Sequence, residues 1–375
     1  MRHGAQRAHT PVVRTIRRGD QGDDVRDVQV RLVALGSSIH PAELEGRYGA
    51  STEAAVRAFQ QRRGLLVDGK VGPETWSELV EAGYSLGDRT LYFRHPTFRG
   101  DDVRALQRRL GAMGFDAGRE DGIFGERTDR AVREFQRNVG REPDGIVGLD
   151  TLQAVQRLRP QQGAISAQMV REAEQVNRMD ASLSGARVAI DPGHDPDDPG
   201  TVGPSGLKES EATHAIAVDL AEELRRRGAE PLLLRDAEER LSPSDRAERA
   251  NDLGAEACLS IHLNGHEDPG AEGSTCFYFG TEDTSSPAGQ RLADLIQGDI
   301  TSRMGLKDGR VHALSITILR ETRMPAVVVE PCFITNPKEE RLIQEEAFRH
   351  DLAIAIAEGL ERFFNTRAKA EASGG

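Results

Sequence analysis

The sequence is poor in cysteine, and this shortage already narrows the class of protein. Its 375 residues include only three cysteines, Cys258, Cys276 and Cys332. Three cysteines without a C-x-x-C spacing exclude a disulfide-stapled fold and a cysteine-based zinc module. Two of the three lie in apolar, strand-like runs, so we expect buried, reduced thiols that suit a reducing compartment.

The sequence also lacks a positive net charge and long apolar runs. The formal net charge is -12 at pH 7 and the pI is near 5.4, which argues against nucleic acid or an anionic membrane as the main partner. No stretch approaches the roughly 18 apolar residues of a transmembrane segment, and residues 1–10 lack the apolar core of a secretion signal. We therefore expect a cytoplasmic protein, with the cell wall or the extracellular space, reached by non-classical export, as the alternative.

The first 160 residues contain an internal repeat. Three blocks recur in the same order: GDDVRDVQVRL at 22–32 and GDDVRALQRRL at 100–110, AVRAFQ at 55–60 and AVREFQ at 131–136, and DGKVG at 68–72 and DGIVG at 144–148. The offset is 78 residues for the first block and 76 for the other two, so the copies differ by a two-residue deletion. Apolar residues in the first block recur at spacings of three and four, which indicates helices. We predict two small three-helix modules, at residues 12–84 and 91–159.

Most of the repeated residues can be explained as helix cores and turns. The repetition therefore shows a duplicated module and says nothing direct about a ligand. Aromatic residues that could stack on a sugar are few, because they make up 5% of the chain. The candidates are Tyr48, Trp76, Tyr92 and Phe124, and we favour a core position for Trp76.

From residue 186 the pattern changes to strand-like runs that alternate with helical ones. The expected strands are 186–190, 231–234, 257–261, 275–279 and 326–329, and the expected helices are 211–227, 244–253, 290–304 and a closing helix whose apolar stripe runs from Phe348 to Phe363. Such alternation predicts an α/β domain at residues 186–365, with a central, mostly parallel sheet flanked by helices. We expect residues 160–185 to be a linker with a short helix at 167–179, and residues 366–375 to be a disordered tail.

Four polar residues stand at the boundaries of these elements. His194 follows the turn that ends the first strand, Glu209 opens a helix, and His262 and Glu330 each follow an apolar strand. Two imidazoles and a carboxylate are a donor set that suits Zn²⁺ in a catalytic site. Glu330 is then placed to take a proton from water and pass it to a leaving amine. Each residue alone is a weak signal, but the four together predict a zinc hydrolase.

Four other residues are less suitable as metal ligands. Glu211 is the alternative to Glu209, which keeps the helix in better register. His266 forms a His-x-x-x-His pair with His262, but that spacing chelates a metal on a helix, and His262 ends a strand. We therefore expect His266 to be exposed. His214 and His312 have no partner pattern, and we interpret them as structural.

Motif by motif, residues 186–364 resemble the zinc-dependent N-acetylmuramoyl-L-alanine amidase family. The matching segments are IDPGH at 190–194, GLKE at 206–209, SIHLN at 260–264 and MPAVVVEPCFITNP at 324–337. The resemblance implies that His194, Glu209 and His262 bind zinc and that Glu330 is the catalytic carboxylate. The implied reaction is hydrolysis of the amide between the lactyl group of muramic acid and L-alanine in peptidoglycan. The repeats are similar to peptidoglycan-binding modules, which implies peptidoglycan or its muropeptide precursors as the partner.

Two positions depart from the family pattern. Asp195 stands where the family usually has glycine after the first zinc histidine, and Pro331-Cys332 stands where it has a glycine before phenylalanine. Cys332 either fills a glycine-sized space, which we favour, or is an oxidisable switch. We see no long helical insertion between residues 280 and 310 that could plug the site, so the cleft should be open.

The alternative hypothesis is that the protein is a cytoplasmic regulator of peptidoglycan precursor synthesis. In that case the amidase-like domain would be a binding scaffold with a protein partner in cell-wall synthesis. The enzyme is the favoured hypothesis because a scaffold has no need of His194, Glu209, His262 and Glu330 together.

Overall fold

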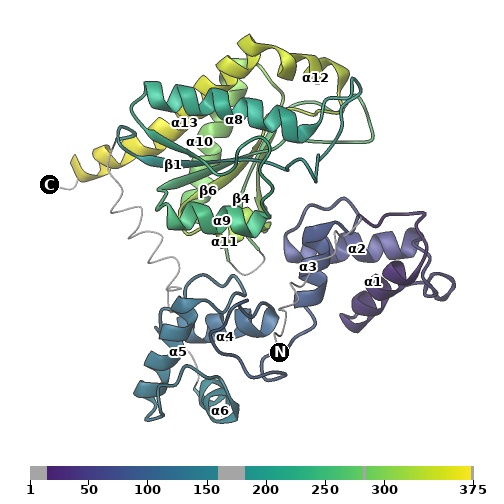
Figure 1. Ribbon diagram of the computed structural model, residues 1–375, viewed down its shortest axis with the longest axis vertical. Helices are drawn as coiled ribbons and strands as arrows, with labels where there is room; N and C mark the ends of the chain where they lie inside the picture. The colour runs from purple at the N-terminus through teal and green to yellow at the C-terminus, as the bar shows by residue number, and fades with distance from the viewer. Residues whose placement is uncertain (1–14, 159–181, 282–283, 373–375) are drawn as a thin grey trace, which may run out of the picture.

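The computed structural model describes residues 15–158, 182–281 and 284–372, which form two helical repeats and one α/β domain (Figure 1). The helix predicted at 167–179 lies outside the described residues. The elements of the repeats are α1 (Asp23–Ala34), η1 (Pro41–Glu43), α2 (Ala50–Arg63), α3 (Pro73–Glu81), α4 (Asp101–Ala112), α5 (Glu126–Asn138) and α6 (Leu149–Arg157). The elements of the α/β domain are β1 (Arg187–Pro192), α8 (Glu209–Arg226), β2 (Glu230–Leu233), α9 (Pro243–Asp252), β3 (Ala257–Ile261), β4 (Ser274–Phe279), α10 (Pro287–Met304), β5 (Asp308–Leu314), α11 (Thr317–Glu321), β6 (Ala326–Glu330), α12 (Pro337–Gln344) and α13 (Glu346–Ala372).

Each repeat has three α-helices around its own apolar core, as the spacing of apolar residues predicts. Equivalent residues of the two copies are buried, because they lie at spacings of three and four on the inner face of their helices. The buried pairs are Val25 and Val103, Val28 and Leu106, Leu32 and Leu110, Val56 and Val132, and Phe59 and Phe135.

A buried glutamine explains two of the repeated motifs. The side-chain amide of Gln60 donates to the Asp68 carboxylate and to the carbonyl of Lys70, both at 2.8 Å, and its oxygen accepts from the backbone N–H of Gly69. Gln136 makes the same contacts with Asp144, Ile146 and Gly145 in the second copy. The FQ and DGxVG motifs therefore fasten a loop to a helix, because a buried amide needs partners for both its donors and its acceptor.

The aromatic candidates are mostly part of these cores. Tyr48 and Phe124 are buried, and the Tyr48 hydroxyl donates to the carbonyl of Gly69 at 2.8 Å. Trp76 is half-buried against the first core, as favoured from the sequence, with the Arg31 guanidinium over its ring. Tyr92 is exposed, so it is the candidate that remains available for stacking on a sugar.

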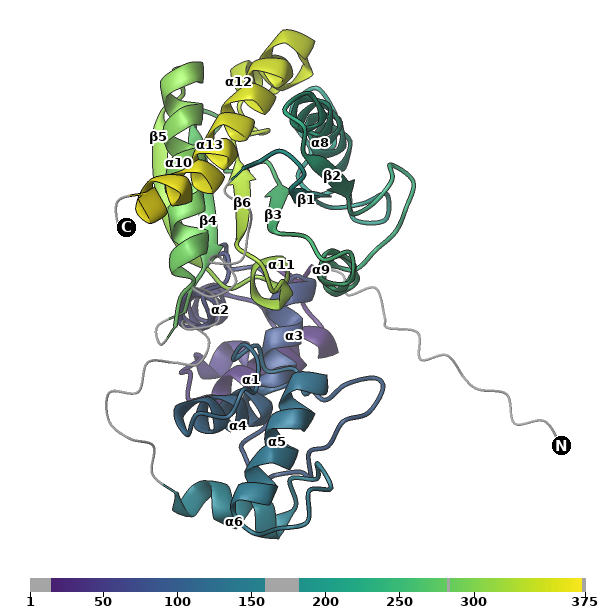
Figure 2. The ribbon, with the colours of Figure 1, turned by 90° about the vertical axis from the view of Figure 1, so that its left-hand side faces the viewer.

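The α/β domain is built on a six-stranded sheet in the order β2-β1-β3-β6-β4-β5. All neighbours are parallel except β4 and β6, which run antiparallel. Alternate residues of the strands face two separate apolar cores. One core is covered by α8, α10 and α13, and the other by α9 and α11 (Figures 1 and 2). The predicted mostly parallel sheet with helices on both faces is confirmed.

Three elements and the end of the chain differ from the sequence expectation. Strand β5 was not predicted, because it lies at the sheet edge with most of its residues exposed and so lacks an apolar run. The short helices α11 and α12 also give little periodic signal. The predicted tail from Thr366 is wrong as far as Ala372, where α13 ends. Residues 367–372 are arginine, alanine, lysine and glutamate, which are strong helix formers, and no glycine or proline interrupts them before Ser373.

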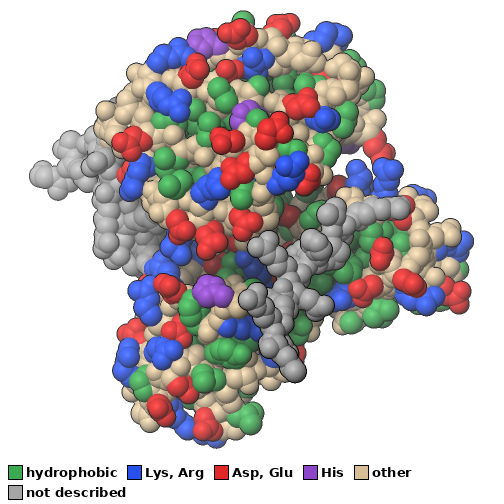
Figure 3. Space-filling view, in the orientation of Figure 1, with side chains coloured by type: hydrophobic (Ala, Val, Ile, Leu, Met, Phe, Trp, Pro, Cys, Tyr) green, Lys and Arg blue, Asp and Glu red, His purple; other side chains and the backbone are tan. Residues whose placement is uncertain are grey.

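The repeats contact the layer of α9 and α11 and the loops around it. Arg99 reaches Glu321 of α11 at 2.6 Å and Ser244 of α9 at 2.6 Å. Arg119 donates to the carbonyl of Leu319 at 3.0 Å. The face in Figure 3 mixes acidic and basic side chains without a large area of one sign. Within the described residues, no helix combines the length and apolar character needed to cross a membrane.

Candidate metal centre and active site

His194 stands in the turn that follows β1. The turn is tied to the neighbouring strand by the Gly193 N–H, which donates to the carbonyl of Ile261 at 2.8 Å. A Cβ atom on Gly193 would lie 2.5–2.7 Å from atoms of the His262 ring, so the two histidines approach each other only because residue 193 has no side chain. Their rings pack edge to face with centroids 4.9 Å apart.

Glu209 is the first residue of α8 and is buried, with 2% of its surface exposed. Its carboxylate accepts from the backbone N–H groups of Thr201 at 2.9 Å and Leu263 at 3.0 Å, which fixes its direction. Glu211 is exposed and pairs with Lys208 at 3.2 Å. The geometry therefore favours Glu209 over Glu211 as the metal ligand.

The structure brings His194, Glu209 and His262 together as a group that could hold a metal ion. One ligand atom from each lies within 4.8 Å of the others. Oε1 of Glu209 is 3.2 Å from Nε2 of His194 and 3.2 Å from Nδ1 of His262. Ligand atoms in a tetrahedral zinc site, about 2.05 Å from the ion, lie about 3.3 Å apart. The donor set, and the spacing of Glu209 from each histidine, therefore fit zinc.

His194 and Glu209 hold each other in charged form. Burial raises the pKa of Glu209, but the hydrogen bonds from His194 and His262 outweigh it, and the net pKa is lowered. Burial also lowers the pKa of His194, but its hydrogen bonds to Asp198 and Glu209 raise the pKa to about 10. Because a metal needs a neutral imidazole nitrogen, binding at this site must release a proton.

Asp198 is a further residue of this site, and its role was not predicted from the sequence. Its carboxylate lies 3.0 Å from Nδ1 of His194, and that hydrogen bond lowers the pKa of Asp198. Because a carboxylate can only accept, Nδ1 carries the proton and Nε2 faces Glu209. Carboxylates that orient a metal-binding histidine in this way are common. The acidic loop that departs from the family pattern thus supplies this partner, and its spacing of four from His194 was the available signal.

Glu330 is the last residue of β6, and its backbone lies between β3 and β4. Burial and the nearby charge of Glu209 raise the pKa of Glu330 to about 8. A carboxyl group that titrates near neutrality in a site with a metal-binding group is suited to proton transfer in both directions.

The remaining sequence candidates are not members of the metal-binding group. His266 is exposed, and its Nδ1 accepts from the backbone N–H of Asp268 at 3.0 Å. His312 is exposed on β5. Cys332 is fully buried in the core, and burial raises the pKa of its thiol, which supports the space-filling reading. Helix α10, between residues 280 and 310, packs against α13 and β4 and does not plug the site.

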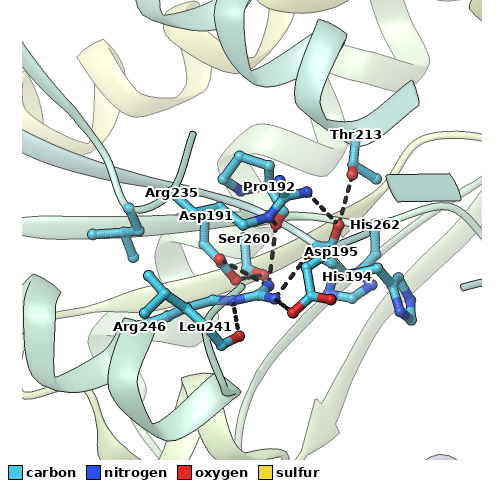
Figure 4. Close-up of polar contacts among 12 residues, drawn as sticks. Asp191, Pro192, His194, Asp195, Thr213, Arg235, Leu241, Arg246, Ser260 and His262 are labelled. Carbon is cyan, nitrogen blue, oxygen red and sulfur yellow. Dashed lines mark hydrogen bonds and ion pairs between the residues drawn. The ribbon is translucent and has the colours of Figure 1, made fainter. Parts of the chain in front are cut away.

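A second group of polar residues lies directly beneath the turn of His194 (Figure 4). It consists of Asp191, Thr213, Arg235, Arg246 and Ser260, which come from β1, α8, the segment after β2, α9 and β3. Asp191 and Ser260 lie within the IDPGH and SIHLN motifs, but the motifs alone predict no role for either residue. Neither arginine was predicted, because a charged residue in an ordinary helix or loop gives no signal of burial.

Residues 188–362 match the family described as N-acetylmuramoyl-L-alanine amidase, and residues 21–79 and 99–155 match the family described as peptidoglycan binding domain. The chain is 38% identical over 363 residues to N-acetylmuramoyl-L-alanine amidase CwlM of Mycobacterium tuberculosis, covering 93% of this chain and 89% of that protein. It is 32% identical over 228 residues to N-acetylmuramoyl-L-alanine amidase AmiA of Escherichia coli, covering 49% of this chain and 79% of that protein.

Among solved structures, the α/β domain is similar to N-acetylmuramoyl-L-alanine amidase AmiC2 of Nostoc punctiforme. The identity is 28%, the TM-score is 0.45, and the match covers 48% of this chain and 98% of that chain. A relative that is 38% identical across nearly the whole chain, with matches to each of the three units, shows that this protein belongs to the N-acetylmuramoyl-L-alanine amidase family and carries two N-terminal peptidoglycan-binding domains.

Proposed function

We propose that the protein is a zinc-dependent N-acetylmuramoyl-L-alanine amidase. It hydrolyses the amide between the lactyl group of muramic acid and L-alanine in peptidoglycan or in its muropeptide precursors. The observation that carries the proposal is the grouping of His194, Glu209 and His262 with ligand atoms within 4.8 Å, together with a half-buried Glu330 whose pKa is raised by burial and by the charge of Glu209. Family membership supplies the substrate class.

His194, Glu209 and His262 would hold the metal through three protein ligands, the number that is usual for a catalytic zinc site. When bound, zinc supplies Lewis-acid polarisation of the scissile carbonyl and lowers the pKa of a water molecule. Asp198 and the backbone donors to Glu209 keep the ligands in place, so little reorganisation is needed when the metal binds.

Glu330 carries the proton in this proposal. Its carboxylate takes a proton from the attacking water and then donates it to the nitrogen of the leaving L-alanine. The raised pKa of Glu330 supports this role, because a carboxyl group with an ordinary pKa would hold a proton too weakly to protonate an amine on its way out.

The repeats would bind the glycan or peptide polymer. Their contacts with α9 and α11 keep them on the same body as the metal site, so polymer held by a repeat stays at high local concentration near the catalytic group. This role rests on the family match of the two repeats.

The test is digestion of purified peptidoglycan by zinc-loaded protein, read by mass spectrometry. We expect stem peptides with a free N-terminal alanine, and none with Glu330→Gln. Glu211→Gln is the matched control, because it removes an exposed carboxylate of α8 outside the site. Zinc bound at one ion per chain without release of stem peptides, on both polymer and soluble muropeptides, would refute the enzyme.

A binding role is the second candidate, favoured by one observation. A pocket of about 270 Å³ lies where both repeats meet the α/β domain, apart from the metal ligands. It is lined by Arg62, Arg63, Glu78, Asp101, Arg104, Ala105, Arg108, Thr281 and Ser315. A regulator of precursor synthesis would use such a composite surface. Binding of a muropeptide precursor by the Glu330→Gln variant with wild-type affinity, combined with no hydrolysis by the wild type, is the result that supports it.

A further inference from the structure

His194 has a backbone conformation that is unfavourable for a residue with a side chain. Its φ is 61°, in the left-handed region, where residues other than glycine pay about 1–2 kcal/mol. In the described part of the chain, Arg310 is the one other non-glycine residue with positive φ. A conformation of this kind persists only where its surroundings hold it. The contacts of the turn identify what holds it here.

Arg246 of α9 reaches under this turn and is buried, with 4% of its surface exposed. All five N–H groups of a guanidinium can be assigned to acceptors. Nε donates to the carbonyl of Leu241 at 3.0 Å, Nη1 faces the carbonyl of Pro192 at 3.1 Å and Asp191 at 3.4 Å, and Nη2 faces the carbonyl of His194 at 2.8 Å and Asp195 at 3.5 Å. One planar group therefore bridges the backbone on both sides of Gly193.

The charge of Arg246 is balanced within the sheet. Asp191 of β1 is buried, with 2% of its surface exposed, and also accepts from the Ser260 hydroxyl of β3 at 2.7 Å. The ion pair with Asp191 therefore anchors the guanidinium to two central strands. A buried charge without such a partner would cost several kcal/mol.

The carbonyl of Gly193, between the two carbonyls that Arg246 holds, has its own donors. The Thr213 hydroxyl of α8 donates to it at 2.8 Å and the Arg235 guanidinium at 3.2 Å. Arg235 also donates to the carbonyl of Pro192 at 3.0 Å. Three successive carbonyls are thus held by side chains from three elements, as Figure 4 shows.

We infer that Arg246 is a positioning residue for the metal centre. It holds the backbone of residues 192–194 in the strained form that directs the imidazole of His194 at Glu209 and His262. Arg235 and Thr213 support the same turn at its middle carbonyl. The inference rests on the proposed metal site. It adds that Arg246 of α9, 52 residues along the chain from His194, sets the geometry of this site.

The test compares Arg246→Met and Arg246→Lys with wild type in the full-length chain. Metal affinity is measured by competition with a chelator, and ligand geometry by the visible absorption of the cobalt(II)-substituted protein. We expect 10–100-fold weaker zinc binding and an altered cobalt spectrum for Arg246→Met. Lysine restores the charge opposite Asp191, but its single nitrogen cannot bridge Pro192 and His194, so Arg246→Lys should recover only part of the affinity.

Arg249→Met is the matched control. Arg249 lies on the same helix and pairs with Glu239, and it donates to the backbone carbonyl of Leu234. Loss of helix packing alone would lower the thermal stability of both methionine variants and change the metal centre in neither. Thr213→Val, which keeps the shape of the side chain, gives a smaller loss of zinc affinity if the turn is what matters.

The outcomes separate this inference from the proposed function. Stoichiometric zinc binding by wild type, with weaker binding by Arg246→Met and unchanged binding by Arg249→Met, supports both. Equal zinc affinity and identical cobalt spectra for wild type and Arg246→Met overturn the positioning role and leave the metal site intact. Failure of the wild type to bind zinc or cobalt overturns the metal site and the positioning role with it.

Discussion

Arg320 of α11 and Glu78 of α3 form a buried ion pair, 2.6 Å between guanidinium and carboxylate, although 242 residues separate them in the chain. Their side chains are 5% and 4% exposed. Burial lowers the pKa of Arg320, but the charge of Glu78 and of three further glutamates outweighs it, so the pKa is raised. Arg320 and the four surrounding glutamates, Glu74, Glu78, Glu81 and Glu321, therefore attach the first repeat to the α/β domain.

We predict that Arg320→Met detaches the repeats without unfolding the α/β domain. Removing one partner of a buried ion pair costs up to about 3–5 kcal/mol. The cost is lower here because Arg104 also pairs with Glu78, at 3.7 Å. Small-angle scattering should show a larger radius of gyration, and thermal unfolding should split into separate transitions. Arg303→Met is the control, since Arg303 makes exposed pairs with Asp351 and Glu358. An unchanged scattering profile would mean that the interface does not depend on Arg320.

The hydrogen bond between Asp198 and His194 predicts the effect of Asp198→Asn. An amide is a weaker acceptor than a carboxylate and can turn its NH₂ group toward the ring, so the preference for a proton on Nδ1 is reduced. We expect about 10-fold weaker zinc binding, measured by chelator competition. Asp197→Asn in the same loop removes an exposed pair with Arg240 and should leave the affinity unchanged. Equal losses in both variants would point to loop charge in place of ring orientation.

The elements and residues that sequence reasoning found share a local signal. His194, His262 and Glu330 each follow a buried apolar strand, and the ends of neighbouring parallel strands meet at one sheet edge. Helices α8, α10 and α13 show apolar stripes because they cover one face of the sheet. The three helices of each repeat could be predicted because the same motifs occur in both copies.

What sequence reasoning missed depends on contacts between distant segments. From its local sequence, Arg246 is expected to be an exposed helix residue. It is buried because the fold places it against Asp191, 55 residues away in the chain. Strand β5 has no apolar pattern because it is an edge strand with β4 as its one neighbour in the sheet, and most of its residues are exposed. The interface residue Arg320 has neighbours that are set only when the repeats dock. The local secondary-structure propensity of a segment does not depend on such pairings between distant segments, so it cannot predict them.

The close approach of Gly193 to His262 predicts that Gly193→Ala disables the metal centre. The added Cβ would lie 2.5–2.7 Å from the imidazole, so the ring has to move away from Glu209. We expect zinc affinity to fall by 10-fold or more while the α/β domain remains folded, as circular dichroism and chelator competition can show. Gly298→Ala is the control, because a Cβ there meets no atom within 4 Å and alanine favours a helix interior. Unchanged zinc affinity in Gly193→Ala would mean that the turn relaxes freely.

The raised pKa of Glu330 predicts a cost in stability that accompanies its catalytic role. The pKa is about 8 in the folded protein against an ordinary value of 4.5, so the folded state binds this proton more tightly than the unfolded chain does. Stability from this group is therefore fully present below about pH 4.5 and is lost as the pH rises toward 8. One pKa unit corresponds to about 1.4 kcal/mol, which sets an upper limit of about 5 kcal/mol, and partial exposure of the side chain reduces it.

Glu330→Gln should therefore abolish hydrolysis and stabilise the metal-free protein above neutral pH. The amide has a similar shape and no charge, so the cost of a buried carboxylate disappears. The difference in melting temperature between variant and wild type, measured after chelation of metal, should be near zero at pH 4.5 and positive at pH 8.5. Glu211→Gln, an exposed carboxylate, should show no such rise. A difference that does not change with pH, or a variant less stable at pH 8.5, would mean that Glu330 ionises in the folded protein at its ordinary pKa, and proton donation to the leaving amine would then need another group.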